Sequence, residues 1–337
     1  MAVGIVSYGS YIPRARIART EYQKAWGSCG ADIKEKAVPE FDEDTLTMGI
    51  EAAKECLRNS PTVSIGALAI ASTSFPYEEK VMSGTVAAML NLPERLFSTE
   101  HGQSTRAGSE AFITAAQLLG NGNGGQALVI ASDAPRALPK ETIEHGLGAG
   151  AAAFVLGTED IIAEIEYVNS FISENMGERY RLAGNSFLSD IGVKGFTGIA
   201  FNELVTKAIQ DVLQHLNRTA ADYDFLVVQE TDGKRVKSLA KKLGFSEEKV
   251  NPGLLYAQIG DTGAASTMLS LAAVLDEAKN GDKILLVSYG SGSGSQAVSF
   301  QVIGNPVGTQ RLSLRKKLEN KKNIDYVQYL KLKRQIM

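Results

Sequence analysis

The chain has 337 residues, of which 44% are hydrophobic and 22% are charged, and its formal net charge is −3. This length predicts two units that each bury a core, and the slight acidic excess argues against a nucleic-acid-binding protein. Two cysteines and no long apolar stretch argue against a disulfide framework, a metal site and a membrane protein, so we expect a cytoplasmic protein.

Short apolar strands alternate with longer helices in the first half of the chain. The expected order is a strand at 3–8, a helix at 42–58, a strand at 65–71, a helix that follows Thr105, a strand at 127–132, and a glycine-rich loop at Gly148 that enters a last strand. This alternation is typical of an α/β protein with buried strands.

The second half repeats the same units in the same order. A helix at 201–216 and a strand at 224–228 match the first pair, and the turn at Thr262, a helix through Lys279 and a strand at 284–289 match the second pair about 157 residues downstream. A glycine-rich loop at Gly292 again enters a closing strand. The sequence therefore predicts an internal duplication, with halves at 1–165 and 166–308.

The last segment, 309–337, differs in composition from both halves. Basic residues alternate in it with Leu, Ile and Tyr: Arg311, Arg315, Lys316, Lys317, Lys321, Lys322, Lys331, Lys333 and Arg334. We interpret it as a basic amphipathic C-terminal tail. A solvated tail or a partner-docking segment fits better than a nucleic-acid or membrane contact, because the rest of the chain is acidic.

Several ordered motifs resemble the archaeal-type HMG-CoA synthases of the thiolase superfamily. They are FDEDTLTMGIEAA from Phe41, GDTGAAS from Gly260, SYGSGSGS from Ser288, the opening VGIVSYGSYIPRARI and the closing NIDYVQYLKLKRQI. The resemblance thus spans the chain. It implies a thiolase fold, with two βαβαβαββ halves in α-β-α-β-α layers.

The resemblance also implies where catalytic residues would lie. In that family a cysteine at a buried helix N-terminus takes acetyl from acetyl-CoA, a glutamate manages protons and a histidine assists the oxyanion. The matching positions hold Thr105, Thr73 and Gln229, and Asp261 matches an asparagine that lines the site. A threonine without a base is a poor nucleophile, and a carboxylate at 261 would repel a developing oxyanion. We therefore predict a degenerate catalytic site.

His101 is the strongest remaining candidate for catalysis, because it lies four residues before Thr105. A lone histidine there is more often a core or interface hydrogen-bonding residue. Cys29 and Cys56 are interpreted as structural, since Cys56 lies on the inward face of a predicted helix. The glycines around Gly148 and Gly292 are interpreted as backbone requirements more than as ligand contacts.

The opening GIVSYG, the strand with DYD at Asp222 that leads into SLAK and LGF, and GDTGAAS followed by KILLVSYG from Lys283 also resemble a particular protein of the superfamily. It is the non-catalytic HMG-CoA-synthase-like subunit of bacterial acetyltransferase complexes that make diacetylphloroglucinol-type compounds. The resemblance implies a homodimer inside a hetero-oligomer, with a thiolase-like catalytic subunit and a small OB-fold and zinc-ribbon subunit. It implies no tightly bound cofactor, although acetyl-CoA or another acyl-CoA would be a substrate of the complex.

Two other functions remain open from the sequence. The first is an acyltransferase or condensing enzyme with a rebuilt, cysteine-free site that uses Thr105, His101 or Gln229 for orientation. The second is an acyl-CoA binding module that passes its ligand on without reacting. Covalent labelling by acetyl-CoA would separate these two functions.

Overall fold

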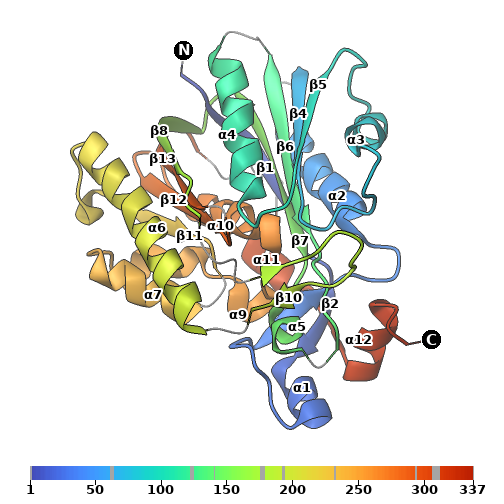
Figure 1. Cartoon of the computed structure of the whole chain (residues 1–337). Helices are drawn as coiled ribbons and strands as arrows, with labels where there is room; N and C mark the ends of the chain where they lie inside the picture. The colour runs from blue at the N-terminus through green and yellow to red at the C-terminus, as the bar shows by residue number, and fades with distance from the viewer. Residues whose placement is uncertain are drawn as a thin grey trace.

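The computed structural model describes residues 2–60, 64–121, 125–139, 141–174, 179–191, 194–230, 233–292, 294–305 and 312–336. Its two halves have the same core topology (Figure 1). The first half contains β1 (Gly4–Tyr11), α2 (Thr45–Arg58), β4 (Ile65–Ala71), α3 (Ser83–Met89), β5 (Phe97–His101), α4 (Ala107–Gly120), β6 (Gln126–Asp133) and β7 (Gly150–Gly157). This is the predicted βαβαβαββ order.

The second half repeats this order with one strand fewer. It contains β8 (Ala163–Phe171), α6 (Lys194–His215), β11 (Phe225–Val228), α7 (Gly233–Lys242), α10 (Ser266–Leu275), β12 (Lys283–Gly290) and β13 (Gly294–Val302). Among its described residues no strand corresponds to β5, so the second half lacks one strand of the βαβαβαββ pattern. Elsewhere the duplication holds, because β8-β13-β12-β11 mirrors β1-β7-β6-β4 in one nine-stranded sheet.

The helices cover the sheet in layers that match the predicted arrangement. Helices α4 and α10 lie in the centre between the two halves, α2 covers the outer face of the first half, and α6 and α7 cover that of the second (Figure 1). Every residue of α10 is buried, which agrees with a sequence that contains no charged side chain. The apolar core has three main clusters: one includes α4 and α10, one lies beneath α6 and α7, and one lies beneath α2.

Local chemistry sets the helix boundaries that differ from the predictions. Helix α2 begins at Thr45 because Asp44 is its cap: the Asp44 carboxylate accepts a hydrogen bond from the Thr47 amide at 2.8 Å, and the Thr47 hydroxyl accepts one from the Asp44 amide at 2.8 Å. Helix α6 begins at Lys194, before the predicted start at Phe201. The prediction missed its first turns because Gly195 and Gly198 weaken the helical signal there.

The remaining elements are short. They are β2 (Ala15–Ala18), α1 (Arg19–Trp26), β3 (Glu35–Val38), α5 (Thr142–Gly146), β9 (Arg179–Tyr180), β10 (Ser189–Asp190), η1 (Ala220–Asp222), α8 (Glu247–Val250), η2 (Asn251–Gly253), α9 (Tyr256–Ile259), η3 (Gly263–Ala265), α11 (Leu314–Glu319), β14 (Lys322–Ile324) and α12 (Tyr326–Leu332). No helix in the described ranges combines the length and the apolar character needed to cross a membrane.

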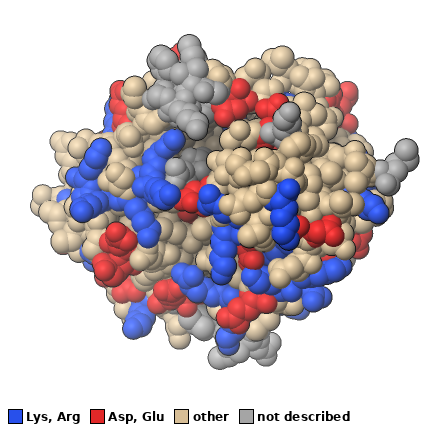
Figure 2. Space-filling model, turned by 90° about the horizontal axis from the view of Figure 1, so that it is seen from below, with Lys and Arg blue, Asp and Glu red and all other residues tan. Residues whose placement is uncertain are grey.

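The described part of the C-terminal segment is packed into the fold, which corrects the expectation of a tail. Strand β14 pairs with β2 in a three-stranded sheet, and Leu314 and Tyr329 are buried. The predicted boundary at 308/309 and Arg311 lie outside the described residues. Residues 312–336 therefore complete the core beside α1 and α5. On the lower face of the molecule, basic side chains are interspersed with acidic ones (Figure 2).

Candidate functional site

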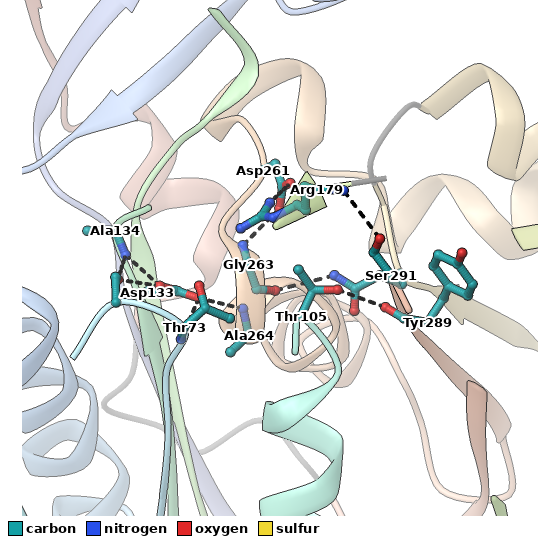
Figure 3. A network of polar contacts seen from close by, with 12 residues as sticks. Thr73, Thr105, Asp133, Ala134, Arg179, Asp261, Gly263, Ala264, Tyr289 and Ser291 are labelled. Carbon is teal, nitrogen blue, oxygen red and sulfur yellow. Dashed lines mark hydrogen bonds and ion pairs between the residues drawn. The ribbon is translucent and has the colours of Figure 1, made fainter. Parts of the chain in front are cut away.

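The four predicted site residues lie in loops of the two halves, two in each half. Thr73 follows β4, Gln229 follows β11, Thr105 precedes α4, and Asp261 precedes η3. Strands β4 and β6 are parallel, and so are β11 and β12, so the ends of each pair meet at one edge of the sheet. Figure 3 shows three of these residues, Thr73, Thr105 and Asp261, around the turn at Gly263 and Ala264.

Thr105 lies at the position matched to the family's cysteine, two residues before α4 begins. Its side chain is buried, and its hydroxyl donates a hydrogen bond to the carbonyl oxygen of Tyr289 at 3.0 Å (Figure 3). A backbone carbonyl accepts a hydrogen bond but cannot remove the proton. The contact therefore positions the hydroxyl without activating it as a nucleophile.

Thr73, matched to the glutamate position, is held by a buried carboxylate. Its amide and its hydroxyl donate hydrogen bonds to Asp133 Oδ2 at 3.1 and 2.7 Å, and the Ala264 amide donates to the same oxygen at 2.8 Å. The second oxygen, Oδ1, accepts hydrogen bonds from the Ser74 hydroxyl and, at 3.1 Å, from the Ala134 amide. Asp133 thus joins the two halves at the site.

Gln229 lies at the position matched to the histidine and is fully buried. Its amide nitrogen Nε2 donates a hydrogen bond to the Gly263 carbonyl at 3.3 Å. Among the described residues its oxygen Oε1 has no hydrogen-bond partner. The side chain is therefore an orienting group that cannot carry a proton through a reaction cycle.

Asp261 forms an ion pair that the sequence does not reveal. Its Oδ2 lies 2.6 Å from Nη1 of Arg179, and its Oδ1 accepts a hydrogen bond from the Gly263 amide at 2.8 Å. Both charged side chains are about nine-tenths buried. The repulsion expected from the Asp261 carboxylate is therefore offset by the guanidinium of Arg179.

His101 does not join this network. It lies on the edge strand β5, where its ring nitrogen Nε2 is 3.2 Å from the Thr99 hydroxyl. Burial lowers the pKa of His101 below its ordinary value, and the nearby Glu110 opposes this shift. Cys56 is fully buried in α2 and Cys29 is half-buried, and the hydrogen bonds found for their thiols lead to Ser7 and Ala31.

The glycine-rich loops match a backbone requirement. A Cβ atom at Gly148 would lie 1.8 Å from the Ile259 carbonyl oxygen, and one at Gly294 would lie 2.0 Å from that of Phe171. Gly294 also has φ +116°, which disfavours any other residue. Gly148 allows segments of the two halves to approach closely, and Gly294 allows β13 to approach the end of β8 within the second half.

Sequence reasoning missed Asp133 and Arg179. Asp133 had a usable signal, since it directly follows the predicted strand at 127–132, at the edge of the sheet where site residues gather. Arg179 had none, because it lies in a segment without a clear periodic pattern. No cluster of three or more His, Cys, Asp or Glu residues that could hold a metal ion occurs in the described ranges.

The nine-stranded mixed sheet, the duplicated halves and the central helices define a thiolase-like α/β protein. Residues 213–302 match the model of the C-terminal domain of 3-oxoacyl-[acyl-carrier-protein] synthase III. The chain is 35% identical to a hydroxymethylglutaryl-CoA synthase of Picrophilus torridus, over 98% of this chain and 97% of the relative. A second such synthase, from Methanosphaera stadtmanae, is 36% identical over 99% of both chains. The chain belongs to the hydroxymethylglutaryl-CoA synthase family, a family of condensing enzymes.

Solved structures share the fold at lower identity. MvaS in complex with 3-hydroxy-3-methylglutaryl coenzyme A has a TM-score of 0.89 and 19% identity, and covers 98% of this chain and 91% of its own. The HMG synthase of the curacin biosynthetic pathway, in complex with a holo donor ACP, has a TM-score of 0.88 and 23% identity, with coverages of 98% and 88%. These two likenesses support the thiolase fold.

Proposed function

We propose that the chain is a non-catalytic HMG-CoA-synthase-like subunit of an acyltransferase complex in specialised-metabolite biosynthesis. The observation that carries this proposal is the 3.0 Å hydrogen bond from the Thr105 hydroxyl to the Tyr289 carbonyl. At the position matched to the nucleophile, the hydroxyl donates its hydrogen bond to a carbonyl oxygen, which is too weak a base to remove the proton. Gln229 at the histidine position likewise offers no base.

The neighbouring contacts support the same proposal. Thr73 replaces the carboxylate of the family with a hydroxyl that donates to Asp133 at 2.7 Å, and Arg179 covers Asp261 at 2.6 Å. These side chains stabilise the loops between the two halves. A subunit kept for its surface needs that framework even when it carries no chemistry.

In the proposed complex the chain is a cytoplasmic homodimer that binds a thiolase-like catalytic subunit and a small OB-fold and zinc-ribbon subunit. Acetyl-CoA or another acyl-CoA is the substrate of the complex as a whole. A related fold has been solved with a carrier protein bound, since the curacin synthase forms a complex with its donor ACP. The exposed side chains of segment 312–336 offer a surface on which such a partner would dock.

A condensing enzyme with a rebuilt site is the second candidate, and a specific observation favours it. Asp133 places a fully buried carboxylate 2.7 Å from the Thr73 hydroxyl, beside the position matched to the family's glutamate. If a proton moved through Asp133, the chain would keep an acid or base without the original glutamate. The end-to-end similarity to synthases agrees with this candidate too.

Radiolabelled acetyl-CoA tests the two candidates. The purified chain and the chain coexpressed with the thiolase-like and small proteins of its genome are assayed for covalent label and for transfer to a phenolic acceptor. We expect no label on the isolated chain, transfer by the complex, and at least half of that transfer in a complex with Thr105→Ala.

A labelled isolated chain whose label is lost in Thr105→Ala or in Asp133→Asn would establish the rebuilt enzyme instead. Thr47→Ala, in the exposed cap of α2, is the matched control for threonine removal. Saturable but non-covalent retention of acetyl-CoA would indicate a binding module.

A further inference from the structure

A cavity of about 500 Å³ lies beside the loop that carries Thr73, next to the end of α12. Its lining includes Ser74 and Ala134. The Ser74 hydroxyl donates to Asp133 and accepts a hydrogen bond from the Ala134 amide at 3.0 Å. The cavity is therefore adjacent to the network of the degenerate site, and its volume suits a small organic molecule.

Cationic side chains gather in the lining of this cavity. They are Arg136, Arg181, Lys333 and Arg334. Arg334 lies over the ring of Phe41 with its Cζ 4.7 Å from the ring centroid, and Arg136 donates through Nη2 to the Lys333 carbonyl at 2.6 Å. The Nε atom of Arg136 is buried and has no hydrogen-bond partner among the described residues. The fold thus leaves a donor at the wall of the cavity unsatisfied, which costs stability until an acceptor pairs with it.

The lining also holds four carboxylates, which are not paired with these cations in the described part of the chain. They are Glu40, Glu43, Asp44 and Glu78. Glu43 accepts hydrogen bonds from the Tyr11 hydroxyl and from the Glu40 amide at 2.7 Å, and Asp44 caps α2. Within the described part of the chain, none of the four forms an ion pair with the cations of the lining.

Lys333 has the least favourable surroundings of the four cations. It is only 8% exposed, and burial lowers its pKa to about 7. Lys36 on β3 and Arg136 after β6 lower it in the same direction, and only Glu144 on α5 opposes them. The Glu144 carboxylate already accepts from Lys36 Nζ at 3.2 Å and from the Tyr22 hydroxyl at 3.0 Å. An added anion would therefore relieve a local excess of positive charge.

We propose that this cavity binds a small organic acid, with its carboxylate at Lys333 and Arg136 and its apolar body against Phe41, Phe75 and Leu332. A guanidinium beside an ammonium suits a planar carboxylate. The acidic residues of the lining disfavour a ligand with several negative charges, so a monoanion fits better than a phosphate. This ligand site is separate from Thr105 and does not depend on whether the chain is catalytic.

Calorimetric titration of the full chain with benzoate tests the proposal, and benzamide serves as the neutral ligand of the same shape. We expect saturable binding of benzoate at pH 7, no binding of benzamide, and at least a tenfold weaker affinity in Lys333→Met. The control Lys316→Met removes an exposed lysine that does not line the cavity, and it should bind benzoate as the unmodified chain does.

Protonation of Lys333 gives a second readout. Above pH 7 the Lys333 amine of the unliganded chain is mostly neutral. Benzoate binding at pH 8 should therefore take up a proton, and the affinity for benzoate should fall by up to roughly tenfold per pH unit. Arg136→Gln provides a variant that leaves Lys333 in place and should also weaken binding.

Three results would overturn the proposal: no saturable binding at 10 mM benzoate, equal binding of benzamide, or unchanged affinity in both Lys333→Met and Arg136→Gln. Binding of inorganic phosphate but not of benzoate, with the same dependence on Lys333, would show that the class of ligand is wrong.

Discussion

Arg179 and Asp261 form an ion pair in which Nη1 lies 2.6 Å from Oδ2, at the centre of the candidate site. Arg179 also donates its backbone amide to the Ser291 hydroxyl at 3.3 Å. The pair therefore joins β9 to the loop before η3 and to the loop after β12. Its removal should affect the conformation of the site as well as the stability of the chain.

We expect Arg179→Met to destabilise the chain by about 2 to 4 kcal/mol, because it leaves the Asp261 carboxylate buried without its cation. Urea unfolding measures the change. The double variant Arg179→Met with Asp261→Asn should recover at least half of the loss, since the uncompensated charge is then absent. Strict additivity of the two single changes would show that the pair is not coupled.

Gly263→Ala should destabilise the chain more than Gly281→Ala. Both glycines have positive φ, but a Cβ at Gly263 would lie 2.2 Å from Asp133 Oδ2, and one at Gly281 would meet nothing within 4 Å. The control therefore contains the backbone strain alone, about 1 kcal/mol, and Gly263→Ala adds a steric clash of about 1 to 3 kcal/mol. Equal unfolding midpoints for the two variants would contradict this assignment.

Glu144→Gln should loosen the C-terminal segment. The carboxylate accepts hydrogen bonds from Lys36, Tyr22 and Tyr329, all buried, so its loss leaves the Lys36 ammonium without a counter-ion. We expect a loss of about 3 to 5 kcal/mol and faster proteolytic cleavage within 312–336. Glu51→Gln, which breaks an exposed pair with Lys54, should cost less than about 0.5 kcal/mol.

Much of the fold could be predicted from the sequence because its halves repeat. The helix at 42–58 and the strand at 65–71 have counterparts at 201–216 and 224–228, and the structure aligns each pair. The missing counterpart of β5 was not visible, since a repeat pattern does not show which strand is absent. The packing of 312–336 was missed because its basic composition hides buried residues such as Leu314.

The site could be predicted only in part. Motif matching pointed to Thr73, Thr105, Gln229 and Asp261, and in the structure each lies in a loop or at its edge. The contacts that hold them were not, because Asp133 and Arg179 reach the site from segments distant in sequence. Hydrogen-bond partners of this kind depend on tertiary structure and leave no local pattern.

Lys333 should give the chain a pH-dependent stability above pH 7. Burial lowers its pKa to about 7 in the folded chain, whereas an unfolded lysine has an ordinary pKa of 10.5. Between these two values the unfolded chain binds more protons than the folded chain, so the free energy of unfolding rises with pH. The penalty for burying Lys333 is complete below pH 7 and shrinks as the pH rises towards 10.5, because less and less free energy is then needed to remove the proton from this amine.

Comparison with Lys333→Met isolates this effect from the tyrosines and other groups that titrate in the same range. Between pH 7.5 and 10, the stability of the unmodified chain relative to the variant should rise by about 1 kcal/mol per pH unit. At pH 6 the variant should be the more stable of the two, because methionine fills the same space without a buried charge. Urea unfolding of both chains at five pH values measures the difference. A constant difference across the range would mean that Lys333 keeps an ordinary pKa, and the positive potential inferred for the cavity would then be absent.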